Sequence, residues 1–143
     1  MYNTALRMVK NAHDAEDVLQ STFVEVFAKL ESFRHESSIG AWIKRITINK
    51  SINFLKSRRL TFQELTPLNE RADEPERDVE LPLSIERVNR AITELPDGYR
   101  MVFTLYAMEG YDHEEIGDIL GITEATSKSQ YSRAKAKLRE MLV

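Results

Sequence analysis

The sequence predicts an all-α fold of two small helical domains joined by an acidic flexible linker, with a helix-turn-helix in the C-terminal domain. Three segments repeat their apolar residues at helical spacing, and no segment of useful length alternates apolar and polar residues as a strand does. Residues 60–80 lack this periodicity, hold 2 basic and 7 acidic residues, and contain Pro67 and Pro75. A segment of this composition buries too little apolar surface to order itself. The predicted domains therefore span residues 1–59 and 81–143, with the linker at 60–80.

The composition excludes several classes of protein. The chain has 143 residues and no cysteine, which excludes a disulfide scaffold and a thiolate metal site. No stretch approaches the ~18 consecutive apolar residues of a membrane span, so we expect no membrane insertion. P-loop and HExxH motifs are absent, and His13, His35 and His113 lie in unrelated segments. We therefore expect a cytoplasmic protein that is not an enzyme, with no catalytic residue, no metal and no cofactor.

The first predicted helix runs from Asp14 to Leu30, with Asp14 as its N-cap. The stripe that we expect to be buried consists of Leu19, Phe23, Val26, Phe27 and Leu30. The opposite face shows, with Gln20 at its edge, the residues Asp14, Asp17, Ser21, Val24 and Glu25. Acids near a helix N-terminus favour its dipole, but this does not explain an exposed valine among them. That valine indicates an interface with another protein.

The second predicted helix follows a polar connector, with Ser37 as its N-cap, and is long and basic. Its apolar stripe begins as Ile39, Trp42, Ile43 and Ile46. It then changes side and continues as Ile48, Ile52 and Leu55. Such a helix either packs on two neighbours or breaks within residues 47–50, and both alternatives stay open. The position of Trp42 on the first stripe favours a core role over stacking on a nucleobase.

The C-terminal half predicts a helix-turn-helix. One helix ends near Pro96, a second ends at Gly110, and a third begins at a capping box formed by Asp112 and Glu115. Gly121 ends this short helix, and Thr123 caps the last one. A small residue, Gly117, suits two helices that cross closely. The layout is that of a helix-turn-helix, although an ordinary helical hairpin has the same spacing.

The faces of the last helix favour DNA binding. Its predicted buried face consists of Ser127, Tyr131, Ala134, Leu138 and Met141. The centre of the opposite face is small: Ala125, Ser129, Ser132 and Ala136. Cations or hydrogen-bonding groups flank this small stripe on both sides: Lys128, Lys135 and Arg139 on one, and Thr126, Arg133 and Lys137 on the other. Small residues let a helix backbone approach the floor of a major groove, and Lys and Arg reach phosphates and guanine edges.

The net charge of −3 is an average over blocks of opposite sign. Residues 1–59 hold 10 basic and 6 acidic residues, and residues 125–143 hold 5 basic and 1 acidic. Residues 81–124 hold 3 basic and 9 acidic residues. The two positive blocks coincide with the long basic helix and the last helix, which are therefore the candidates for contact with nucleic acid.

In this order, the segments resemble an extracytoplasmic-function (ECF) sigma factor of bacterial RNA polymerase, in the sigma-seventy family. The segment DAEDVLQSTFVEVFAKLESFRHESSIGAWIKRITINKSINFLKSRR is similar to sigma region 2. The segment LPDGYRMVFTLYAMEGYDHEEIGDILGITEATSKSQYSRAKAKLREML is similar to sigma region 4. Two alternatives are a non-sigma helix-turn-helix transcription regulator and a helical protein-interaction module with basic faces.

The resemblance implies functional residues and partners. Residues matching the segment that docks on the beta-prime clamp helices of RNA polymerase core are Asp14, Asp17, Gln20, Ser21, Val24 and Glu25. Residues matching the minus-10 pocket, where the family captures a flipped base, are Arg34, His35, Glu36, Ser37 and Ser38. Asn49 and Asn53 would supply amide hydrogen bonds there. Phosphates would be held by Lys44, Arg45, Lys50, Lys56, Arg58 and Arg59.

The resemblance further implies that the last helix reads the minus-35 element of promoter DNA through Thr126, Lys128, Ser129, Ser132 and Arg133. Residues 99–108 match the part that meets the beta flap, and an anti-sigma factor is an expected partner. The chain opens inside the first helix of region 2, so we expect a short N-terminus. Ser127 occupies a slot usually held by Val, so the start of the recognition helix is expected to be less firmly packed.

Overall fold

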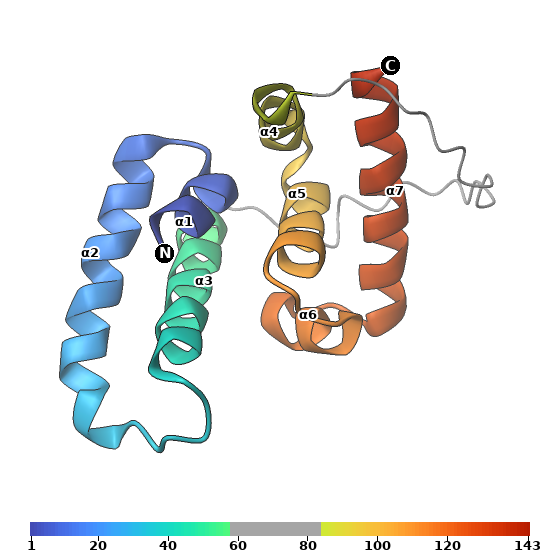
Figure 1. Ribbon diagram of the computed structural model, residues 1–143. Helices are drawn as coiled ribbons and strands as arrows, with labels where there is room; N and C mark the ends of the chain where they lie inside the picture. The colour runs from blue at the N-terminus through green and yellow to red at the C-terminus, as the bar shows by residue number, and fades with distance from the viewer. Residues whose placement is uncertain (58–83) are drawn as a thin grey trace. The chain divides into compact units, whose positions relative to one another are not determined.

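The computed structural model describes residues 1–57 and 84–143, and these residues form helices and no strand (Figure 1). The all-α prediction is therefore confirmed. The chain divides into two compact units, Met1–Leu60 and Thr61–Val143. The predicted linker, residues 60–80, lies outside the described residues, and the predicted domain limits stay a prediction.

The described part of the N-terminal unit, residues 1–57, contains three α-helices. They are α1 (Tyr2–Val9), α2 (Ala12–Lys29), which continues into the 3-10 turn η1 (Leu30–Ser32), and α3 (Ile39–Ser57). Helices α2 and α3 run antiparallel side by side, and α1 packs against both (Figure 1). The apolar periodicity did not predict α1, which has only eight residues. It nevertheless contributes Ala5, Met8 and Val9 to the core.

The long basic helix is continuous. Helix α3 buries Ile46 and then Ile48, Ile52 and Leu55, and it contacts both α1 and α2. Of the two open alternatives, packing on two neighbours is confirmed and a break within residues 47–50 is wrong. The two hydroxyls on the buried side are satisfied within the helix, because Thr47 donates to the Ile43 carbonyl at 3.0 Å and Ser51 donates to the Thr47 carbonyl at 2.9 Å.

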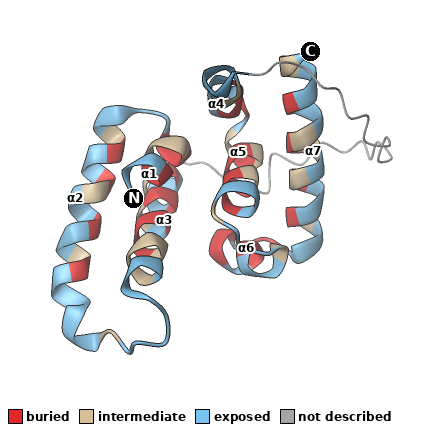
Figure 2. Cartoon of the chain, in the orientation of Figure 1, coloured by how far each residue is buried: buried red, intermediate tan, exposed pale blue. Residues whose placement is uncertain are grey.

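The predicted buried face of α2 is wrong. The residues that α2 buries are Ala15, Val18, Thr22 and Val26. Of the predicted stripe, Val26 is buried and Leu19 is half-buried, whereas three members are exposed: Phe23, Phe27 and Leu30. The two faces lie roughly a quarter turn apart at 100° per residue. Small and β-branched residues line the side of α2 that packs against its neighbours, and Figure 2 shows this side as the red stripe toward α3.

The predicted N-caps of α2 and α3 each require a correction. Asn11, not Asp14, caps α2, and its side-chain oxygen accepts from the Asp14 amide at 3.1 Å. Ser38, not Ser37, caps α3, because its hydroxyl oxygen accepts from the Ala41 amide at 3.1 Å. In both cases the true cap stands three residues before the amide that it binds, as capping geometry requires.

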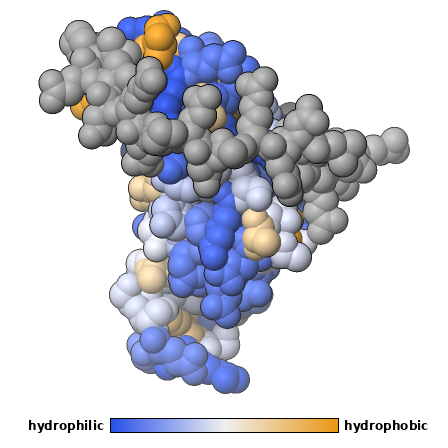
Figure 3. Space-filling model, turned by 90° about the vertical axis from the view of Figure 1, so that its right-hand side faces the viewer, coloured by the Kyte–Doolittle hydropathy of each residue, from blue (hydrophilic) through white to orange (hydrophobic). Residues whose placement is uncertain are grey.

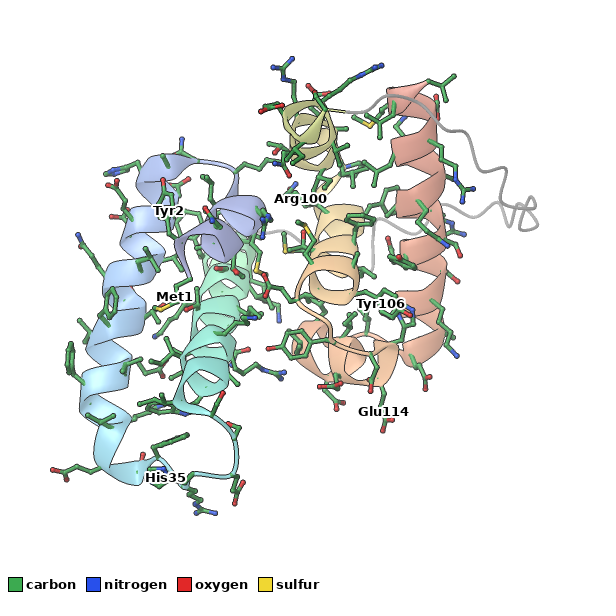
Figure 4. The ribbon with its side chains drawn as sticks, viewed as in Figure 1. Met1, Tyr2, His35, Arg100, Tyr106 and Glu114 are labelled. Carbon is green, nitrogen blue, oxygen red and sulfur yellow. The ribbon has the colours of Figure 1, made fainter. Side chains whose placement is uncertain are left out.

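Within residues 84–143, the C-terminal unit has four α-helices. They are α4 (Ile85–Glu94), α5 (Asp97–Phe103), which continues into the π turn η2 (Thr104–Met108), α6 (His113–Leu120) and α7 (Glu124–Leu142). The long helix α7 packs against α4, α5 and α6. Arg100 is fully buried at the corner between α4 and α5, where it donates to the Leu95 carbonyl at 3.1 Å and to the Asp97 carboxylate at 2.5 Å (Figure 4).

Helices α6 and α7 form the predicted helix-turn-helix. The Asp112 carboxylate accepts from the Glu115 amide at 2.8 Å, and the Glu115 carboxylate accepts from the Asp112 amide at 3.3 Å, so the capping box is complete. Gly121 ends α6 with φ 71°, a left-handed conformation that favours glycine. The Thr123 hydroxyl oxygen then accepts from the Thr126 amide at 3.0 Å and starts α7. A Cβ on Gly117 would lie 2.7 Å from the Ile122 carbonyl oxygen.

We expect Gly117→Ala to lower the free energy of unfolding of the C-terminal unit by about 2 kcal/mol, because the added methyl meets backbone that cannot move away freely. The control is Gly40→Ala on α3, where a Cβ has no heavy atom within 4 Å. That change should be neutral or stabilising by up to ~1 kcal/mol. Urea unfolding followed by circular dichroism measures both variants. If Gly117→Ala left the free energy of unfolding of its unit as little changed as Gly40→Ala leaves that of the other unit, the close approach at Gly117 would be contradicted.

Candidate nucleic-acid interface

Helix α7 carries a narrow, exposed stripe of small side chains along the side that faces away from the unit. This stripe, as predicted, consists of Ala125, Ser129, Ser132 and Ala136, all of which are exposed. The residues buried on the other side are Ser127, Gln130, Ala134 and Leu138. In Figure 3 the surface outside the grey residues is mostly hydrophilic, with small and separate apolar spots. The helix therefore offers a narrow ridge of small side chains rather than a broad apolar face.

Cations flank this stripe on both sides, and the structure gives several of them a partner. Lys128 lies 3.4 Å from the Glu124 carboxylate, and Lys137 lies 3.8 Å from the Glu140 carboxylate. The Lys135 ammonium lies 5.1 Å from the centre of the Tyr131 ring. All of these groups stay at least partly exposed, and exposed ion pairs of this kind contribute under about 1 kcal/mol. They can therefore exchange their partners for phosphates at little cost.

The five residues predicted to read the minus-35 element lie on the first three turns of α7. Ser129 and Ser132 are exposed on the stripe, and Lys128 is exposed beside it. Thr126 is half-buried, and its hydroxyl oxygen accepts from Thr123 at 2.8 Å. Arg133 is half-buried, and its Nη1 atom has no hydrogen-bond partner among the described residues. The structure thus brings the five together on one side of the helix, and their role stays a prediction.

Ser127, at a position where Val is usual, is held by a specific contact. It is fully buried, and its hydroxyl lies 2.8 Å from the Nδ1 atom of His113 at the start of α6. This hydrogen bond joins the two helices of the helix-turn-helix. The expected looseness at the start of the recognition helix is therefore replaced by a polar contact. The sequence pattern does not predict this contact, because His113 and Ser127 stand 14 residues apart.

Aromatic rings surround His113. The Tyr106 ring (labelled in Figure 4) stacks on it at 4.4 Å between centroids, and the Tyr131 ring lies 5.7 Å away. Burial lowers the pKa of His113, and the nearby Lys128 lowers it further, while Glu124 and Asp112 oppose this shift. His113 therefore takes up a proton less readily in the folded unit than in the unfolded chain.

The connector before α3 is an exposed polar segment with aromatic side chains packed beside it. All five residues predicted for the minus-10 pocket, residues 34–38, are exposed. The Phe33 ring lies 4.6 Å from the His35 ring and 4.9 Å from the half-buried Trp42 ring. His35 has φ 55°, so the chain turns sharply there (Figure 4). Trp42 packs on Phe33 rather than lying free for a nucleobase, in keeping with its predicted structural role.

The residues of α3 predicted to contact minus-10 DNA, by amide hydrogen bonds or through phosphates, do not form one face. Asn49, Asn53 and Lys56 are exposed at i, i+4 and i+7 and so lie in one line along the helix. Lys44, Arg45 and Lys50 are half-buried. The Lys50 ammonium lies 3.7 Å from the Glu25 carboxylate of α2. Arg58 and Arg59 lie outside the described residues, so their placement stays a prediction.

The outer side of α2 holds the predicted polymerase-binding residues and an apolar surface beside them. Asp17, Gln20, Ser21 and Val24 are exposed, whereas Asp14 and Glu25 are half-buried. A hydrogen bond from Lys29 at 2.7 Å is the main cause that lowers the pKa of Glu25, and Lys50 adds to it. Three neighbouring residues, predicted from their spacing to be core, lie on this surface instead: Phe23, Phe27 and Leu30.

The exposed apolar residues of α2 and η1 form one surface, which we call the α2 apolar surface and define as Phe23, Val24, Phe27 and Leu30. Val24 and Phe27 are the most open, with exposed fractions of 72% and 75%. Their apolar character at helical spacing was visible in the sequence, but that signal is the same for a core and for an interface.

Comparisons with known proteins place both units. A family model described as Sigma-70 region 2 matches residues 1–61, and one described as Sigma-70, region 4 matches residues 85–138. The ECF RNA polymerase sigma factor SigM of Bacillus subtilis (strain 168) is 30% identical over 146 residues, which cover 99% of this chain and 87% of that protein. The chain belongs to the ECF sigma factor family. Matches to both regions in this order favour a sigma factor over the two alternatives.

Other ECF sigma factors and solved structures agree with this placement. The ECF RNA polymerase sigma factor SigE of Mycolicibacterium smegmatis is 31% identical over 147 residues, which cover 99% of this chain but 57% of that relative. The sigma factor RpoE of Bartonella quintana, solved in complex with the anti-sigma factor NepR, has a TM-score of 0.67 and 26% identity, covering 99% of this chain and 88% of that one. CnrH, solved with the cytosolic domain of CnrY, has a TM-score of 0.59 and 27% identity, covering 99% and 79%.

No helix within residues 1–57 and 84–143 combines the length and the apolar character that crossing a membrane requires.

The His113 contact predicts a pH dependence of the C-terminal unit of this sigma factor. An unfolded chain binds a proton at histidine near pH 6.5, whereas the pKa of folded His113 is lower. The unfolded state therefore holds more protons just below that pH. This contribution to stability is fully present above about pH 6.5 and decreases as the pH falls toward the folded pKa. We expect His113→Asn, which keeps a hydrogen-bonding group beside Ser127, to reduce that decrease.

Urea unfolding at pH 7.5 and 5.5 measures the effect. The control is His13→Asn, since His13 is an exposed residue of α2 in the other unit. The pH dependence of the C-terminal unit should be unchanged in that variant. An undiminished pH dependence in His113→Asn would contradict the prediction.

Proposed function

We propose that this sigma factor binds RNA polymerase core and directs promoter recognition and transcription initiation in the cytoplasm. The observation that carries the proposal is the narrow stripe of small side chains on α7 between two rows of cations. A major groove admits one helix, and a recognition helix enters it with its N-terminal residues toward the base edges. In this proposal α7 reads the minus-35 element through Thr126, Lys128, Ser129, Ser132 and Arg133.

The N-terminal unit would open the promoter at the minus-10 element. The exposed connector supplies polar groups for a flipped base. Three exposed residues in one line along α3 would contact the separated DNA strand: Asn49, Asn53 and Lys56. Extracting a base costs a few kcal/mol of stacking, which hydrogen bonds and phosphate contacts have to offset. Lys50 contributes to this only if it leaves the Glu25 carboxylate, because the two groups lie 3.7 Å apart in the free chain.

The outer side of α2 would dock on the beta-prime clamp helices of the polymerase. Its polar residues Asp17, Gln20 and Ser21 are exposed, and the α2 apolar surface lies beside them. Apolar side chains exposed on a small unit are costly unless a partner covers them, which supports a protein interface here. Residues 99–108 would meet the beta flap. Both solved relatives above are complexes with a second protein, which supports an anti-sigma factor as a further partner.

Run-off transcription tests the proposed function. The full chain is added to sigma-free bacterial core polymerase with a library of promoters. We expect transcripts from a subset of promoters that share an upstream and a downstream element. Transcription no higher than with core alone, from a chain shown to be folded by circular dichroism, would reject the sigma function.

Phe27→Ser tests the docking surface. Phe27 is 75% exposed, so its loss should leave the stability of the N-terminal unit nearly unchanged, whereas a covered aromatic residue is a common hot spot of an interface. We expect the affinity for core polymerase, measured by fluorescence anisotropy, to fall about 10-fold. Ile85→Ser is the matched control, because Ile85 is 77% exposed in the other unit. Equal affinities of the two variants for core polymerase would contradict docking through the α2 apolar surface.

A further inference from the structure

The first turn of α7 carries an ion pair, and only one of its two residues is among those predicted to read DNA. Glu124 is the first residue of α7, and its carboxylate lies 3.4 Å from the Lys128 ammonium one turn further along. The side chains are 54% and 62% exposed. At i, i+4 spacing both lie on one edge of the small stripe. Lys128 belongs to the predicted minus-35 set, and Glu124 does not.

The other side chains of this turn carry no charge. The Thr126 hydroxyl oxygen accepts from Thr123, and the Ser127 hydroxyl bonds to His113 inside the unit. Ala125 has no polar group. Glu124 and Lys128 are therefore the charged groups that α7 presents before Arg133, within the part of a recognition helix that reaches base edges.

The pair offers an acceptor beside a donor. In the major groove a G·C base pair shows the complementary arrangement, since the cytosine N4 amino group is a donor and guanine O6 and N7 are acceptors. We propose that the Glu124–Lys128 pair reads one G·C base pair of the upstream promoter element. Glu124 accepts from cytosine N4, and Lys128 donates to guanine O6 or N7. This inference rests on the proposed function of α7.

Glu124 acts on specificity more than on affinity. Phosphates repel a carboxylate, so Glu124 weakens nonspecific binding to any duplex. At a base pair that presents no amino group to it, the carboxylate loses water without gaining a hydrogen bond, and that sequence is penalised. The plain alternative is that Glu124 only favours the helix dipole at the N-terminus of α7. The alternative predicts a change of stability and no change at any single base position.

The test is selection by the holoenzyme. Core polymerase loaded with the full chain binds a promoter library that is randomised over the upstream element, and bound DNA is sequenced. Wild type should enrich one C·G pair about 10-fold over the other pairs at a single position. Glu124→Ala should reduce that enrichment to under about 2-fold and leave the other positions unchanged. Glu124→Gln should shift the preference at this position toward adenine, because a glutamine amide pairs with adenine N6 and N7.

Glu140→Ala is the matched control. Glu140 is also an exposed carboxylate of α7 paired with a lysine, Lys137 at 3.8 Å, but it lies in the last turn of the helix. Its removal should leave the whole profile unchanged. Melting temperatures of the variants separate a loss of folding from a loss of reading.

The possible outcomes are distinguishable. A wild-type holoenzyme without any upstream preference would reject the proposed function of α7 itself. A wild-type preference that Glu124→Ala leaves intact at every position would overturn the inference alone, as would a uniform change of affinity on all sequences. An A·T pair selected at the Glu124-dependent position would overturn the base assignment.

Discussion

The close approach of α6 to the turn before α7, over Gly117, is the constraint on which the geometry of the C-terminal unit depends. A Cβ at residue 117 would lie 2.7 Å from the Ile122 carbonyl, so only glycine permits the turn to close at this point. Gly121 then reverses the chain in a left-handed conformation, and Thr123 caps α7 directly afterwards. Because the turn is so short, the position of α6 fixes where α7 begins and which way its first residues point.

The rotation of α7 about its own axis depends on polar contacts as well as on apolar packing. An apolar residue at position 127 would pack acceptably over a range of rotations, whereas the hydrogen bond between Ser127 and His113 has a narrow geometry. The Tyr106 ring, stacked on His113, and the Tyr131 ring, tilted against it, hold His113 in turn. With Ser127 fixed, Glu124 and Lys128 project beside the small stripe rather than across it. The buried polar contact thereby determines which charges a ligand of α7 meets first.

The sequence was sufficient for features that depend on spacing and on chain geometry. The capping box at Asp112, the cap at Thr123 and the exposed small stripe follow from residue types at fixed intervals, and the structure has all of them. The buried face of α2 did not follow, because Phe23 and Phe27 have the same periodicity whether they meet α3 or a partner. Thr22 lies in the core instead, where it donates to the Val18 carbonyl at 2.8 Å. A hydroxyl satisfied within its own helix gives no signal in the sequence that it is buried.

The number of charged residues in the sequence likewise differs from the number that the fold leaves available to a ligand. The positive blocks identify the helices proposed to meet DNA, but the count treats every cation as free. In the folded chain Lys50 lies beside Glu25, and Lys128 lies beside Glu124. These two pairs differ in consequence. Lys50 and Glu25 come from different helices, with side chains 33% and 24% exposed, so their separation also removes a contact between α2 and α3. Lys128 and Glu124 share an exposed turn, and their separation costs about 0.3–0.5 kcal/mol. Lys50 is therefore held in a contact between two helices, whereas Lys128 can exchange its partner for a ligand.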